Sequence, residues 1–122
     1  MSTITVTPIA GSLGAEVRGV DLRTMDNQAW ATVHQAFLDH KVIAIRGQDL
    51  GAQDMMDVGA RFGEPNHYPF VKGLDGFPFL FDVIKEPSEK RNFGGGWHSD
   101  TTYMQAPPMA TLLYAIETPS RG

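Results

Sequence analysis

A short apolar run, Val42-Ile43-Ala44-Ile45, lies between two segments that have the periodicity of amphipathic helices. Such a run is typical of a strand that is buried on both faces. Before it, apolar residues recur at helical spacing over residues 26–40, with Thr24 or Asp26 as the candidate N-cap. After it, residues 52–62 show a second apolar face at the same period. The chain therefore combines helices with strands.

The remaining hydrophobic segments have the composition of strands. Two short ones, residues 3–6 and 15–20, flank the turn-prone sequence Gly11-Ser12-Leu13-Gly14. Two longer ones, residues 77–84 and 109–116, lie on either side of a polar, glycine-containing stretch. The predicted fold class is α+β, mainly β, with two flanking helices.

The composition argues against several classes of function. A chain of 122 residues with 42% hydrophobic and 20% charged residues has the balance of one ordinary globular domain. The net charge of −4 and the scattered basic residues predict no nucleic-acid partner. The absence of cysteine leaves imidazole, carboxylate and water as metal ligands. Because no apolar run is long enough for a signal peptide or a membrane span, we expect a cytoplasmic protein without a membrane partner.

A glycine run precedes a histidine and an aspartate in the sequence Gly94-Gly95-Gly96-Trp97-His98-Ser99-Asp100. In an extended strand, residues two apart point to the same face, so His98 and Asp100 can converge on one ion. They would then supply two of the three ligands of a 2-His-1-carboxylate site for non-haem Fe(II). The other interpretation is structural, with the imidazole simply bonded to the neighbouring carboxylate.

The order of several motifs resembles the taurine catabolism dioxygenase (TauD/TfdA) family. The resemblance rests on the segment 14–22, on Arg61-Phe62-Gly63-Glu64-Pro65, and on the stretch from Trp97 to Asp100 followed by Ala106-Pro107-Pro108. Members of this family are Fe(II)- and 2-oxoglutarate-dependent oxygenases built on a double-stranded β-helix, a jelly roll related to the cupins. The resemblance implies that residues 1–122 are the N-terminal part of one such domain, truncated at the C-terminus, with a partial jelly roll.

The same resemblance assigns roles to single residues. His98 and Asp100 correspond to the first two iron ligands and are the predicted catalytic residues. His67, Tyr68, Gly94 and Thr101 fall on the substrate side. Taurine-type members have a substrate-binding His at the position of Tyr68 and an Asn at that of Gly94, and a Tyr offers no cation for a sulfonate. His67 and Tyr68 can equally be read as ordinary loop residues.

The implied activity is hydroxylation of a small organic acid with Fe(II), 2-oxoglutarate and O2, releasing succinate and CO2. Sulfonates, sulfate esters, aryloxy acids and carboxylic acids all remain open as substrates. The third ligand and the Arg that binds 2-oxoglutarate are expected beyond Gly122, so the 122 residues alone should be inactive. Oligomeric state is left open, a homo-oligomer included. The alternative is a non-catalytic small-molecule or metal-binding β-domain in which His98 and Asp100 are structural.

Overall fold

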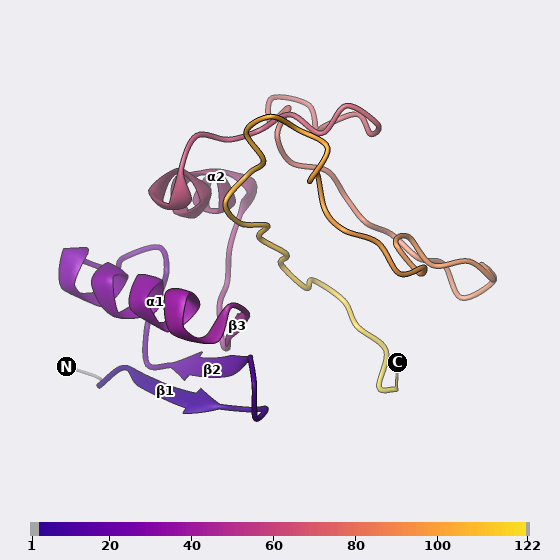
Figure 1. Ribbon diagram of the computed structural model, residues 1–122. Helices are drawn as coiled ribbons and strands as arrows, with labels where there is room; N and C mark the ends of the chain where they lie inside the picture. Colours follow the sequence, from indigo (N-terminus) through magenta and orange to yellow (C-terminus); the bar gives the residue numbers. More distant parts are fainter. Residues whose placement is uncertain (1–2, 122) are drawn as a thin grey trace. The chain divides into compact units, whose positions relative to one another are not determined.

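The computed structural model describes residues 3–121, and these contain three strands and two helices (Figure 1). Their order along the chain is β1 (Thr5–Pro8), β2 (Ala15–Arg18), α1 (Asn27–His40), β3 (Ile43–Ile45) and α2 (Ala52–Phe62). The chain divides into two compact units, one ending at Leu50 and the other beginning at Gly51. No helix among the described residues is long and apolar enough to cross a membrane.

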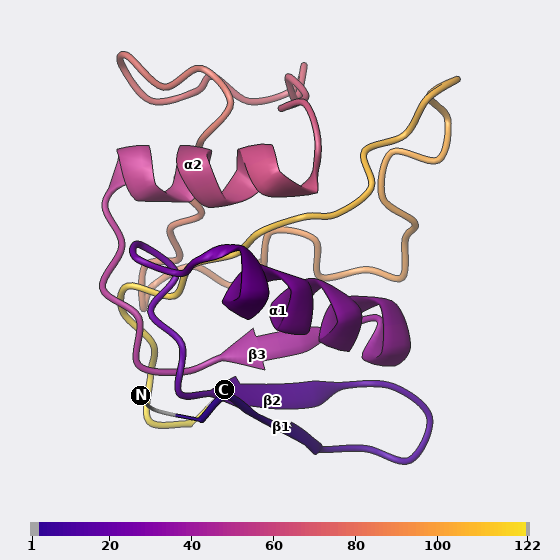
Figure 2. The ribbon, with the colours of Figure 1, turned by 90° about the vertical axis from the view of Figure 1, so that its left-hand side faces the viewer.

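The first unit is a three-stranded sheet with the order β1-β2-β3, covered on one face by α1 (Figure 2). β1 and β2 pair antiparallel, with Thr5 opposite Arg18 and Pro8 opposite Ala15. β2 and β3 pair parallel, with Ala15 opposite Ile43. Two parallel neighbours cannot be joined by a tight turn, and α1 supplies the crossover between them.

The core of this unit lies between α1 and the central strand. Val33 and Ala36 of α1 are buried against Val17 of β2, and Val17 and Val33 are fully inaccessible to solvent. Half-buried apolar side chains surround this centre: Ile4, Val6, Val20, Trp30, Ile43 and Ile45. Burial of this apolar area is the main free energy that holds α1 on the sheet.

Both helices have the predicted boundaries. The Asp26 carboxylate caps α1 by accepting a hydrogen bond of 2.8 Å from the Ala29 amide, which confirms Asp26 rather than Thr24 as the N-cap. In α2 the Asp54 carboxylate accepts a bond of 2.8 Å from the Gly51 amide, and the helix ends before Gly63. These ends were predictable because capping depends on residues close in sequence.

Two arginines of the first unit share one carboxylate. Glu16 on β2 accepts hydrogen bonds from Arg18 Nε at 2.5 Å and from Arg46 Nε at 2.9 Å. Arg18 is the larger cause, and both bonds hold the pKa of Glu16 below its ordinary value. The ion network ties β2 to the residue that follows β3.

The strand predictions were less accurate than the helix predictions. The first strand covers Thr5–Pro8 instead of 3–6, and the second ends at Arg18 instead of at residue 20. The apolar run 42–45 was expected to be buried on both faces, and this is wrong: β3 is half-buried and Val42 is 57% exposed. The reason is that in the first unit α1 covers only one face of the sheet, and β3 lies at the edge of that sheet.

The two longer predicted strands are absent from the described residues. Segments 77–84 and 109–116 form no strand in the described part of the chain, and Phe77, the first residue of the earlier segment, makes an isolated bridge with Leu74. Hydrophobic composition alone does not form a strand, because each strand needs a hydrogen-bonding partner. The described residues therefore form an α+β structure with more helix than strand, so the expectation of a mainly β chain is wrong for them.

Candidate functional site

His98 and Asp100 converge, although they do not lie in a strand. Both are in an irregular segment of the second unit, where His98 Nε2 lies 3.2 Å from Asp100 Oδ1. Their side chains are 55% and 69% exposed, so this pair contributes little to the packing of the unit. The predicted convergence is therefore present, and irregular backbone produces it rather than the alternation of a strand.

The other ring nitrogen of His98 is held by the backbone. His98 Nδ1 lies 2.7 Å from the carbonyl oxygen of Gly96. A carbonyl can only accept a hydrogen bond, so Nδ1 is the donor in this contact. The ring is thus oriented with Nδ1 toward the glycine segment and Nε2 toward the carboxylate.

The donor set of this pair suits a borderline divalent ion. One imidazole nitrogen and one carboxylate oxygen are ligands that non-haem Fe(II) uses, and the exposure of both leaves room for further ligands. Among residues 3–121, no group of three or more His, Cys, Asp or Glu side chains comes together as a metal site. The described residues thus fit two of the three expected protein ligands.

Gly94 lies against the ring of His98. Residues 92–95 form a tight turn in which the Gly95 amide donates to the Asn92 carbonyl at 3.3 Å, and Gly94 adopts a left-handed backbone with φ of 67°. A Cβ at Gly94 would lie 3.4 Å from His98 Cε1 and 3.9 Å from Nε2. An open hollow of about 390 Å³ is lined by residues 94–98. Of the predicted substrate-side residues, Gly94 is the one placed directly at the histidine.

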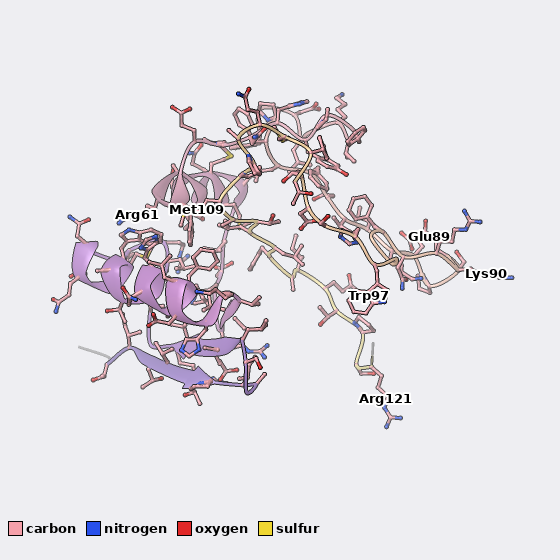
Figure 3. The ribbon with its side chains drawn as sticks, viewed as in Figure 1. Arg61, Glu89, Lys90, Trp97, Met109 and Arg121 are labelled. Atoms are coloured by element: carbon pink, nitrogen blue, oxygen red, sulfur yellow. The ribbon has the colours of Figure 1, made fainter. Side chains whose placement is uncertain are left out.

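The surroundings of the motif are exposed to solvent. Trp97, the neighbour of His98, is fully exposed (Figure 3). Glu89 and Lys90 project from the end of the loop that precedes the glycine run (Figure 3). Thr101 is half-buried, has a left-handed backbone with φ of 48°, and begins a turn closed by the Met104 amide at 3.0 Å. This turn begins immediately after Asp100 and so follows the segment 94–100 that carries both side chains.

His67 and Tyr68 lie in different surroundings. His67 lines a second open hollow, of about 500 Å³, together with residues 69–76 and Pro78. Lys72 and Asp75, which also line this hollow, face each other at 3.8 Å and are both almost fully exposed. The hollow therefore presents an imidazole and an ammonium group, but the carboxylate beside the ammonium partly offsets its charge.

Tyr68 belongs to an aromatic cluster that sequence reasoning missed. Its ring stacks on Phe81 with centroids 5.5 Å apart and meets the edge of Phe70 at 5.4 Å. Phe81 in turn contacts Phe93 at 6.2 Å, immediately before the glycine run. The cluster thus connects the loop around Tyr68 to the segment that carries His98. Nothing in the local pattern of these four residues indicates that their rings meet.

Comparisons with known proteins agree on one family. Residues 5–122 match the family described as taurine catabolism dioxygenase TauD, TfdA. A sulfate ester dioxygenase of Pseudomonas putida, dependent on alpha-ketoglutarate, is 34% identical over 119 residues, which are 96% of this chain and 38% of that protein. An alkylsulfatase of Acinetobacter baylyi is 32% identical over 116 residues, 93% of this chain and 36% of that protein.

A solved structure shares the fold. A taurine dioxygenase from Burkholderia xenovorans superimposes with a TM-score of 0.57 and 35% identity, over 62% of this chain and 28% of that one. The chain therefore spans less than two fifths of the length of the curated relatives described above.

Proposed function

We propose that these 122 residues form the N-terminal part of one Fe(II)- and 2-oxoglutarate-dependent dioxygenase domain. The chain belongs to the taurine catabolism dioxygenase (TauD/TfdA) family. In this proposal the three-stranded sheet is the beginning of a jelly roll that further strands complete. Its support is the family match over residues 5–122 together with the greater length of the relatives.

The observation that carries the proposal is the 3.2 Å approach of His98 Nε2 to Asp100 Oδ1. Two atoms that both have lone pairs come this close when a cation lies between them, either a proton or a metal ion. His98 and Asp100 would hold Fe(II) through these atoms, and a third ligand would come from outside the described residues. Fe(II) held there together with 2-oxoglutarate would supply the O2-dependent hydroxylation of the substrate, with release of succinate and CO2.

The substrate in this proposal is a small organic acid, and a sulfate ester is the first to test. Two relatives are named for sulfate esters or alkyl sulfates, and both match more than nine tenths of this chain. His67 and Lys72 line one hollow, and both carry hydrogen-bond donors suited to an anionic group. Tyr68 would add a hydroxyl donor from the aromatic cluster.

The test compares three variants of the complete protein in an assay of succinate formation from 2-oxoglutarate with Fe(II) and an alkyl sulfate. His98→Ala and Asp100→Ala are expected to lose turnover to background. Ser99→Ala is the matched control, because Ser99 lies between them and its hydroxyl contacts Thr102 Oγ1 at 3.3 Å. It should keep at least half of the activity. Undiminished succinate formation by Asp100→Ala would contradict the ligand assignment.

A second candidate function rests on the same contact. A contact of 3.2 Å between His98 and Asp100 is also what a purely structural hydrogen-bonded pair would show in a non-catalytic small-molecule or metal-binding β-domain. The two candidates differ in metal binding. The dioxygenase requires tight binding of Fe(II) that both alanine variants lose, whereas the structural pair predicts no difference between wild type and variants.

A further inference from the structure

We infer that Gly94-Gly95-Gly96 is a positioning element for His98, in which the backbone of the glycine run selects the ring nitrogen that is left free for a metal. The inference rests on the proposed function for the identity of the ligand. The orientation of the ring itself is independent of that function.

The first step is the hydrogen bond of the ring. The Gly96 carbonyl accepts a hydrogen bond from His98 Nδ1, with 2.7 Å between the two atoms. Nε2 lies 3.2 Å from Asp100 Oδ1, a distance that places a cation between the two atoms. With Nδ1 bonded to the Gly96 carbonyl, Nε2 is the nitrogen that can give its lone pair to a metal ion in that place. An acceptor that binds the N–H of the ring nitrogen not used for the metal sets the tautomer and orientation of metal-binding histidines.

The second step is the turn that places this carbonyl. Residues 92–95 turn the chain through the bond from the Gly95 amide to the Asn92 carbonyl. At its third residue, Gly94, this turn has a left-handed backbone with φ of 67°. Most L-residues with a side chain are strained in this conformation. A strained residue at this position would displace the peptide units that follow, including the carbonyl of Gly96.

Gly94 and Gly96 differ in what a side chain would disturb. A Cβ at Gly96 would meet no atom within 4 Å, and its backbone lies outside the left-handed region. A Cβ at Gly94 would make an ordinary contact of 3.4 Å with the ring, so the backbone conformation is the main requirement there. Gly94→Ala should thus disturb the element, while Gly96→Ala keeps both the carbonyl and the turn. Gly94→Asn adds a side chain but should keep the turn, because Asn tolerates a left-handed backbone.

The first experiment measures binding of Mn(II) alone to the complete protein by calorimetry, for wild type and these three variants. Gly94→Ala is expected to weaken binding by roughly 10- to 100-fold, the range typical for loss of an outer partner. Gly94→Asn and Gly96→Ala should stay within about threefold of wild type. Equal weakening in Gly94→Ala and Gly94→Asn would overturn the inference, since the added side chain rather than the backbone conformation would then be at fault. Wild-type affinity in Gly94→Ala would overturn it as well.

The second experiment reads the ring without any metal. In Asp100→Ala protein the carboxylate no longer competes for the ring, so the Gly96 carbonyl alone selects the tautomer. Nitrogen NMR of labelled histidine at alkaline pH, where the ring is neutral, should show Nδ1 protonated in Asp100→Ala. The double variant Gly94→Ala, Asp100→Ala should lose this preference. Nε2 protonated in Asp100→Ala would overturn the inference. If wild type binds no Mn(II) while the tautomer is as expected, the iron-dependent function fails and the positioning element stands.

Discussion

Replacement of Val33 by Ala is expected to destabilise the first unit by about 2 kcal/mol. Val33 lies on α1, is fully buried and packs against Val17 and Ala36. Truncation removes two carbons from the core, each worth about 0.8 kcal/mol, and leaves a small cavity that adds roughly 1 kcal/mol. Because Ala has a higher helix propensity than Val, the substitution also stabilises the helix by roughly 0.5 kcal/mol, which offsets part of this loss.

The matched control is Thr32→Ala, one residue earlier on the same helix. Thr32 is also β-branched, but it is exposed, and its hydroxyl only donates to the Gln28 carbonyl at 3.2 Å. Its replacement should change stability by less than about 0.5 kcal/mol. The assay is hydrogen exchange of the backbone amides of α1 and β2 in the folded protein. Val33→Ala should speed their exchange about 30-fold, because 1.4 kcal/mol corresponds to a factor of ten. If both variants exchange at the same rate, α1 does not pack on the sheet through this face.

Two further predictions concern charge and metal binding. The arginines keep the pKa of Glu16 below its ordinary value of 4.5, so its ion pairs stabilise the fold above that pH and are lost as pH falls through the lower folded-state pKa. The free energy of unfolding, measured with urea between about pH 6 and about pH 3, should therefore fall less with decreasing pH in Glu16→Gln than in wild type. The same fall in both proteins would argue against the ion network. The 122-residue chain by itself is expected to bind Fe(II) weakly and to be inactive with 2-oxoglutarate, because residues 3–121 bring no third ligand to His98 and Asp100. It should also self-associate, because the apolar side chains of Leu113, Ile116 and Ile84 are at least 70% exposed. Oxygen uptake and sedimentation measure this, and a monomer with oxygen uptake would contradict it.

The helices and the close approach of His98 to Asp100 could be predicted from local sequence. α1 and α2 have their hydrogen bonds within one continuous segment each, so periodicity was sufficient to place them, while the choice between Thr24 and Asp26 as the cap of α1 came from the structure. The i, i+2 spacing of His98 and Asp100 indicated their convergence because two residues this close in sequence need only one local backbone conformation to meet. The family resemblance came from motifs of the same short range.

Strand pairing and the environment of the pair depend on contacts between residues far apart in sequence. Segments 77–84 and 109–116 have the composition of strands and still form no strand among the described residues, since a strand is stabilised by its partner and not by its own pattern. The stacking of Tyr68 on Phe81 and the contact of Phe81 with Phe93 likewise join separate segments. The hydrogen bond from His98 to the Gly96 carbonyl could not be predicted from the sequence. Every residue carries a carbonyl oxygen, and only the folded backbone directs this one at the ring.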